Sequence, residues 1–172
     1  YWFYNFHKAY VKNQQIGPGD KFICYVTKHQ RFMGVLEIQS ESYIDNSPLF
    51  SPIKDPFVLR FKVKPLVWLP LEKAIPIRTD SIWHTLSFTK GLPKNSCQWT
   101  YKFFSSPRVW PEEDCIHIEK LLLAQATKLI DYPLSSATAK GQLMDSLYKD
   151  CKKANAIKFS KKAHGQHKGM GE

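Results

Sequence analysis

Alternation of apolar and polar residues predicts a β-hairpin near the start of the chain. Residues 21–26 alternate after the turn sequence Gly17-Pro18-Gly19-Asp20, and residues 32–40 alternate again beyond a short basic turn at 27–31. A period of two residues sends successive side chains to opposite faces of a sheet, and glycine and proline favour tight turns. We therefore expect the two runs to pair as neighbouring strands.

A third strand is predicted at residues 57–63, and the run at 66–69 continues or follows it. One face of this strand would be apolar and the other basic. The apolar positions are Phe57, Leu59, Phe61 and Val63, and the basic ones are Arg60, Lys62 and Lys64. Residues 82–88 are compatible with either a further strand or a short helix.

Helical spacing is clear only after residue 110. Pro111 suits the first position of a helix, and the carboxylates at 112–114 suit the positive end of its dipole. The apolar stripe that follows consists of Cys115, Ile118, Leu122, Ala126 and Leu129, and Tyr132-Pro133 would end the helix. The whole pattern predicts an α+β domain over residues 1–133, a helical extension over 134–157, and a flexible basic tail or linker over 158–172.

Composition agrees with a packed domain and adds a strong positive charge. The 172 residues are 43% hydrophobic and 14% aromatic, with a net charge of +10. Such an excess favours partners that carry phosphates, because fixed cations release the counterions of nucleic acid. Eight lysines lie in residues 140–172 against Asp145, Asp150 and Glu172, so about half of the excess belongs to this stretch.

Motifs for catalysis, metal binding and membrane insertion are missing from the sequence. It contains no phosphate-cradling GxxxxGK[ST], no GxGxxG and no GxSxG, and its four cysteines include no CxxC pair. His164 and His167 lack a third ligand nearby, and helix capping is the better interpretation of the acidic residues 112–114. We therefore expect no enzyme activity, no cofactor, no metal, reduced thiols, and a cytoplasmic protein without a membrane span.

Several segments in the same order resemble the EVE-domain family. Residues 16–26 (IGPGDKFICYV) resemble its glycine turn and first hairpin strand, and residues 32–38 with Tyr43 and Asp45 resemble the strand and loop that follow. The basic strand 57–65 and the ending built from Gln98-Trp99, Arg108 and residues 111–122 are also similar. The order and approximate spacing agree across residues 2–123, and residues 135–172 have no counterpart in the family.

The resemblance implies a PUA-like twisted β-barrel flanked by helices, related to the YTH domains. It also implies an aromatic pocket for a modified, methylated base, for which Trp2, Tyr25 and Phe50 are the candidates in this chain. Trp2 is expected outside the hairpins, and Phe50 stands where the family offers an aromatic loop residue. The basic rim that would contact the nucleic-acid backbone consists of Lys28, Arg31, Arg60, Lys62, Lys64 and Arg108.

Each of these assignments has an alternative that the sequence leaves open. An aromatic residue can belong to the core, as we expect of Trp99, and a basic strand face can be merely solvated. For function, one alternative is a reader of modified DNA bases, such as the specificity module of a modification-dependent restriction system fused or bound to an effector domain. A module for modified RNA and a protein-interaction module without base recognition are the others.

Overall fold

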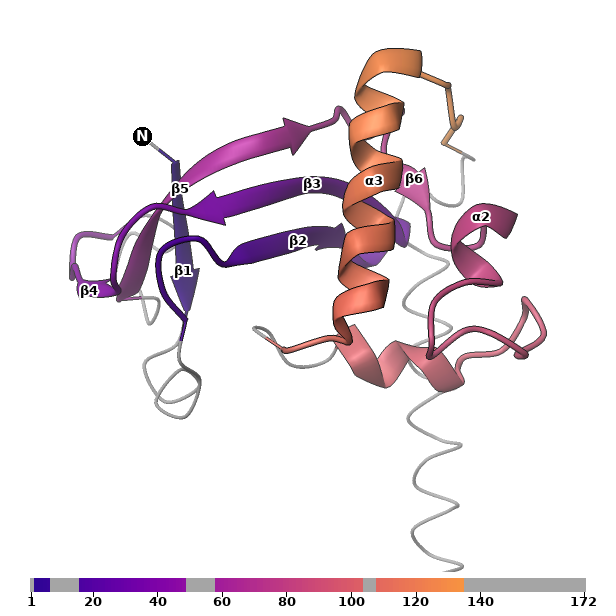
Figure 1. The fold of residues 1–172 in the computed structure, drawn as a ribbon, viewed down its shortest axis with the longest axis horizontal. Coiled ribbons are helices and arrows are strands. Elements are labelled where there is room, and N and C mark those ends of the chain that lie inside the picture. Colours follow the sequence, from indigo (N-terminus) through magenta and orange to yellow (C-terminus); the bar gives the residue numbers. More distant parts are fainter. Residues whose placement is uncertain (1, 7–15, 49–57, 104–107, 135–172) are drawn as a thin grey trace, which may run out of the picture.

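The computed structural model describes residues 2–6, 16–48, 58–103 and 108–134, and for residues 2–6 it describes the main chain alone. The predicted helical extension and basic tail, which fill residues 135–172, lie outside the described residues. Phe50 also lies outside them. The described chain is an antiparallel sheet with helices on one side, so the α+β class is confirmed (Figure 1).

Six strands form the sheet, in the order β1-β5-β3-β2, with β4 paired to β5 and β6 paired to β3. They are β1 (Trp2–Phe6), β2 (Lys21–Val26), β3 (Arg31–Ile38), β4 (Tyr43–Ile44), β5 (Leu59–Trp68) and β6 (Ile75–Pro76). Within the described residues β1 and β2 lie at opposite ends of this order and do not pair, so the sheet is open there rather than closed into a barrel.

The predicted hairpin is present as β2 and β3, with one difference at each end of the second strand. β3 begins at Arg31, because the 3-10 turn η1 (Thr27–His29) is only three residues long and Gln30 reverses the chain with a φ of 53°, and it ends at Ile38. Before β2, Gly19 has a φ of 93°, a left-handed conformation that favours glycine. The glycine signal in the sequence therefore corresponds to a real turn.

The third predicted strand and the apolar run after it form one continuous strand, which has an additional partner. β5 runs from Leu59 to Trp68, and a register shift opposite Val35 and Leu36 lets it continue past Pro65. Its other neighbour is β1, in which Trp2 pairs with Val63. Trp2, for which the sequence predicts a place outside the hairpins, thus belongs to an edge strand of the sheet.

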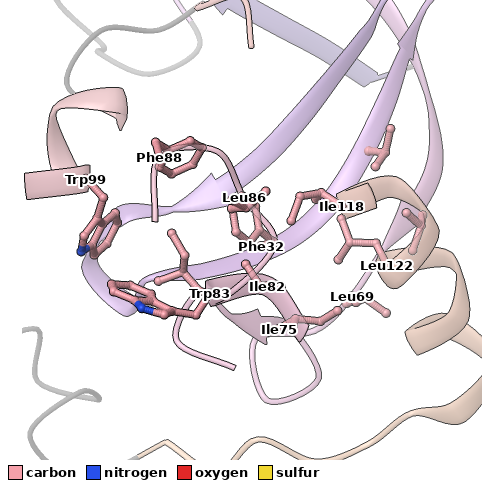
Figure 2. Packing of buried hydrophobic residues seen from close by; sticks show 13 residues of the cluster. Phe32, Leu69, Ile75, Ile82, Trp83, Leu86, Phe88, Trp99, Ile118 and Leu122 are labelled. Atoms are coloured by element: carbon pink, nitrogen blue, oxygen red, sulfur yellow. The ribbon is translucent and has the colours of Figure 1, made fainter. Parts of the chain in front are cut away.

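The main core lies between the sheet and helix α3 (Glu112–Lys128), which packs across β2, β3 and β5 (Figures 1 and 2). Residues 82–88 contribute part of helix α2 (Asp80–Trp83) and the turns after it, and Trp83 and Leu86 are fully buried there. A second, smaller core of Cys24, Leu36, Ile38, Phe61 and Val63 is built from strand residues alone. Trp99 is buried, as predicted.

Helix α3 begins where the sequence predicts and ends earlier. Ile118 and Leu122 are buried as expected, but Ala126 and Leu129 are exposed and Gln125 is buried in their place. Gln125 is accommodated because its Nε2 donates to the carbonyls of Lys73 and Ile130, at 2.8 and 2.6 Å. Leu129 has a φ of 50° and closes the helix, three residues before the predicted stop at Tyr132.

One of the three acidic residues in the first turn of α3 is buried and holds a neighbouring loop. Asp114 is buried and accepts hydrogen bonds from the main-chain N–H and the hydroxyl of Ser87, at 3.0 and 2.6 Å. Glu112 and Glu113 are exposed at the positive end of the helix dipole.

No helix within the described ranges is long and apolar enough to cross a bilayer.

Candidate functional site

Six aromatic rings meet at one end of the main core, and we call them the aromatic cluster: Tyr25, Phe32, Phe88, Trp99, Phe103 and Trp110. Phe103, the last residue of the 3-10 helix η2 (Gln98–Phe103), lies at the centre. Its ring centroid is 3.9 Å from that of Tyr25, 5.2 Å from Trp110 and 5.7 Å from Trp99. Most of these pairs are edge-to-face, an arrangement that aromatic rings prefer.

A β-bulge brings Tyr25 into this cluster. The register of β2 against β3 shifts between Cys24 and Tyr25, so that Tyr25 pairs with Phe32. A bulge bends a strand and redirects the side chain beside it. The rings of Tyr25 and Phe32 lie 4.9 Å apart, and the Tyr25 ring is also stacked on Phe103 at an interplanar angle of 26°.

The hydroxyl of Tyr25 is buried and has no hydrogen-bond partner among the described residues. Burial raises the pKa of Tyr25 well above its ordinary value, and the positive charge of Arg78 only partly opposes that rise. The hydroxyl is therefore neutral and able to donate. A buried polar group without a partner costs roughly 1–3 kcal/mol, so a ligand that accepted this hydrogen bond would relieve a real penalty.

Arg78, between β6 and α2, carries a half-buried positive charge next to two tryptophans. Its guanidinium carbon is 5.4 Å from the ring centroid of Trp99 and 5.8 Å from that of Trp83, and its Nε donates to the carbonyl of Lys94 at 2.8 Å. Burial lowers the pKa of Arg78, with the neighbouring Tyr25 acting in the opposite direction. Within the described part of the chain no carboxylate pairs with it.

A cationic edge flanks the aromatic cluster and consists of Tyr101, Lys102 and Arg108. The Tyr101 ring is 46% exposed, with the Lys102 ammonium 5.4 Å and the Arg108 guanidinium carbon 5.6 Å from its centroid. Arg108 also donates to the Tyr101 carbonyl at 3.1 Å, and Lys102 lies 5.8 Å from the Phe88 centroid. The edge combines a partly exposed aromatic residue with two positive charges that lie over its ring.

Two of the predicted backbone-binding cations are instead buried structural residues. Arg60 is 2% exposed and donates from Nη1 to Asp45 at 2.6 Å and to the Ser47 hydroxyl at 2.9 Å. Arg31 is also buried, and its Nη atoms donate to the carbonyls of Leu71, Tyr132 and Pro133. Arg60 therefore does not share an exposed face with Lys62 and Lys64, because its charge is already compensated inside the fold.

The remaining predicted cations are exposed but lie in different places. Lys62 and Lys64 are exposed on β5, opposite Phe3 and Glu37 in the neighbouring strands. Lys28 is exposed in the turn after β2, and Arg108 belongs to the cationic edge. Of the predicted rim, four residues are thus accessible to a phosphate.

The structure does not bring the predicted pocket residues together. Trp2 pairs with Val63, which pairs with Ile38, whereas Tyr25 pairs with Phe32 at the other end of β3. The six positions from Phe32 to Ile38 span roughly 20 Å along a strand. A single base cannot lie against both Trp2 and Tyr25, and the third candidate, Phe50, lies outside the described residues.

Sequence reasoning missed Arg78 and two residues of the cationic edge, Tyr101 and Lys102. A signal for the latter was present, because aromatic and polar residues alternate from Trp99 to Phe103 and a basic residue, Lys102, stands between two of the rings. Arg78 gave no such signal.

Among the described residues no group of three His, Cys, Asp or Glu side chains could hold a metal ion.

Comparison with known proteins identifies a relative of this chain. The UPF0310 protein PH1033 of Pyrococcus horikoshii is 33% identical to this chain over 122 residues, which are 63% of the chain and 77% of the relative. No protein-family model matches the chain.

Proposed function

The chain belongs to the UPF0310 family, and from that premise we propose that it is a nucleic-acid-binding module that recognises a modified, methylated base. The observation that carries the proposal is the cationic edge beside the aromatic cluster. Tyr101 offers an exposed ring, and Lys102 and Arg108 hold positive charge around it. Proteins that bind single-stranded nucleic acid combine these same two features, stacking rings and a basic surface that follows the phosphates.

Within the proposal each group has a distinct role. The Tyr101 ring stacks on a base, a contact worth roughly 1–3 kcal/mol. Lys102 and Arg108 contact the phosphates on either side and, with Lys28, set the salt dependence of binding. Lys62 and Lys64, which are exposed on β5, contact another part of the backbone.

The proposal also includes a PUA-like fold for the domain. The resemblance of residues 16–26 and 111–122 to EVE-domain proteins supports a PUA-like domain, and that resemblance is the reason to expect a modified base rather than any base. A methyl group adds about 0.8 kcal/mol of favourable burial against an apolar surface. The roles of Trp2 and Phe50 as pocket walls remain predictions.

Neutralising the cationic edge tests the proposal directly. The double variant Lys102→Gln, Arg108→Gln is expected to weaken binding to a single-stranded oligonucleotide. It should also reduce the slope of log K against log salt by about 1.4, because each phosphate that a protein cation neutralises on a single strand adds about 0.7 to that slope. A matched control is Lys120→Gln, an exposed position on α3 away from the edge. An unchanged slope in the double variant, or an equal change in the control, would contradict the proposal.

A protein-interaction module is the second candidate, and exposed apolar side chains on α3 and just beyond its end favour it. Ile116 and Leu123 on α3, and Ile130 after it, are each about half exposed, although polar neighbours separate them. This alternative predicts that Ile116→Ser and Leu123→Ser abolish self-association or partner binding and leave oligonucleotide affinity unchanged. Sedimentation measurements beside the oligonucleotide titration separate the two candidates.

A further inference from the structure

Helix α3 presents two large apolar side chains to solvent. Ile116 is 55% exposed and Leu123 is 45% exposed, whereas Ile118 and Leu122 are fully buried against the sheet. Because the two exposed residues are seven positions apart, close to two full turns, they lie one above the other on the same side of the helix. Apolar positions at this spacing are typical of a helix that packs against another helix.

Charged residues that lack ion-pair partners surround these two side chains. Lys120 stands between them in the sequence, is exposed, and forms no ion pair within the described part of the chain. No residue three or four positions from Lys120 along α3 carries a carboxylate. Glu112 and Glu113, exposed in the first turn, form no ion pair with any described residue either. We call Ile116, Leu123 and these three charged residues the outer face of α3.

The helix is locally acidic in a chain that is strongly basic. Its 17 residues include four carboxylates and only two lysines, whereas the whole chain has a net charge of +10. Two copies of so basic a chain repel each other over most of their surfaces. The outer face of α3, which carries both signs of charge, is a surface at which two copies can approach with little repulsion.

One antiparallel arrangement matches the apolar and the charged positions at the same time. If the helices of two copies lie side by side with Ile116 opposite Ile116, a residue four positions after it lies level with the residues three or four positions before it in the second copy. Lys120 is then level with Glu112 and Glu113 of the second copy. Twofold symmetry forms this contact twice, because each copy offers both the lysine and the carboxylates.

Other arrangements of the two helices lose this match. A parallel pair places Lys120 against Lys120 and one acidic first turn against the other, and like charges at such positions are destabilising. It also aligns the two helix dipoles. An antiparallel pair with Ile116 opposite Leu123 brings the two copies of Lys120 together at its centre. In the arrangement centred on Ile116, Leu123 instead reaches the level of Val109, which is 78% exposed just before the helix.

We propose that the outer face of α3 binds a second copy of this chain, as an antiparallel and twofold-symmetric pair of helices centred on Ile116. Burial of Ile116 and Leu123 supplies the affinity, and the two contacts of Lys120 with the carboxylates of the other copy fix the register. The proposal goes beyond the proposed function and does not depend on nucleic-acid binding. A dimer is compatible with either candidate function.

Charge reversal in the full chain tests this register, with sedimentation velocity over a range of concentrations as the measurement. Lys120→Glu alone and Glu113→Lys alone are each expected to weaken self-association roughly tenfold, because each replaces two attractive pairs by two repulsive ones. An equimolar mixture of the two variants should regain most of the lost association, because opposite charges then meet in both contacts.

Two further variants complete the experiment. Lys128→Glu is the matched control, because it reverses the same charge in the last turn of α3, beyond the proposed contact, and should leave self-association unchanged. Ile116→Ser removes the central apolar contact and should leave the protein monomeric at concentrations where the wild type is dimeric. All of these side chains are exposed, so the variants should fold, and circular dichroism checks that they do.

Several results would overturn the proposal. A wild type that stays monomeric at every soluble concentration would mean that a second copy does not cover this face. Self-association that is as strong in Ile116→Ser or in Lys120→Glu as in the wild type would place the contact elsewhere on the molecule. A mixture that associates no better than Lys120→Glu or Glu113→Lys alone would rule out the antiparallel register. None of these results bears on oligonucleotide binding, so the proposed function stands or falls separately.

Discussion

At Tyr25, the fold buries one polar atom without giving it a hydrogen bond within the described chain. The hydroxyl is buried without a partner among the described residues, so it costs the fold free energy. Buried polar groups in folded proteins are nearly always hydrogen-bonded, and an exception calls for an explanation.

Removing this oxygen should therefore not destabilise the free protein. We expect Tyr25→Phe to leave the free energy of unfolding unchanged or to raise it by up to about 1 kcal/mol. Thr89→Val is the matched control, because the buried Thr89 hydroxyl donates to the Trp83 carbonyl at 2.7 Å and its loss should cost about 1 kcal/mol. Urea denaturation measures both; a loss of 1 kcal/mol or more in Tyr25→Phe would mean that its hydroxyl has a partner.

The Cys24 thiol makes stability depend on alkaline pH. Burial in the second core raises the pKa of Cys24 from 9.0 to about 12 in the folded protein. Because the unfolded chain loses this proton first, the stabilisation is complete below pH 9 and declines as pH rises toward 12. The free energy of unfolding should fall by about 1.4 kcal/mol per pH unit through this window on account of Cys24.

Cys24→Ala isolates that contribution. The variant loses some packing at every pH, but the wild type should approach it in stability between pH 9 and 10.5, where urea denaturation of both proteins can be compared. Parallel pH profiles for the two proteins would show that the thiol titrates normally in the folded state and that the core around it is accessible to water.

On the scale of elements, the contact of β3 with β5 depends on a glycine. A β-carbon added at Gly34 would lie 2.7 Å from the Trp68 ring and 2.7 Å from the Val67 carbonyl oxygen. The carbonyl belongs to the paired strand and cannot move without breaking the register. The Trp68 ring therefore rests directly on the main chain of the neighbouring strand.

Gly34→Ala should accordingly cost roughly 1–3 kcal/mol of stability, in the range of overpacked sites. Gly17→Ala is the matched control, since its added carbon would meet only the end of the Glu41 side chain at 3.4 Å. Thermal unfolding of both variants gives the comparison. A Gly34→Ala protein as stable as the control would mean that the two strands do not approach as closely as described.

Strands and helices with a periodic pattern could be predicted from the sequence, whereas the burial of individual polar residues within them could not. The β2–β3 hairpin and the start of α3 follow from alternation, a glycine turn and a proline with three carboxylates. The burial of Arg60 could not be predicted, because it depends on Asp45, which β4 brings alongside β5. The burial of Gln125 escaped prediction for a similar reason: its partners, the Lys73 and Ile130 carbonyls, lie outside the helix.

The candidate site could be predicted only in part, because its residues are brought together by contacts between elements that no sequence pattern reports. A family resemblance identifies Tyr25 and Arg108, and both lie at or beside the aromatic cluster. Tyr101 and Arg78 lie in a 3-10 helix and a loop, where no periodicity reports which side is buried. The sequence predicts a surface cation at Arg31, whereas this residue holds the chain at Tyr132 and Pro133.

For the whole molecule, charge and structure together decide how binding should behave. The net charge of +10 ensures some attraction to any polyanion, so affinity alone is weak evidence for recognition. What distinguishes recognition is a difference between two ligands with the same number of phosphates. Stacking on the base and burial of its methyl group contribute to the difference between the two affinities. Phosphate contacts contribute equally to both affinities and therefore do not affect the difference.

The most direct test of the account is the ratio of two affinities of the full chain, for a methylated and an unmethylated oligonucleotide of the same sequence, each measured single- and double-stranded. We predict that one methylated ligand binds about fourfold or more tightly, as expected for a buried methyl group worth about 0.8 kcal/mol. We also predict that this ratio persists as salt weakens both complexes. Equal affinities across the panel, or no binding at low salt, would contradict the account.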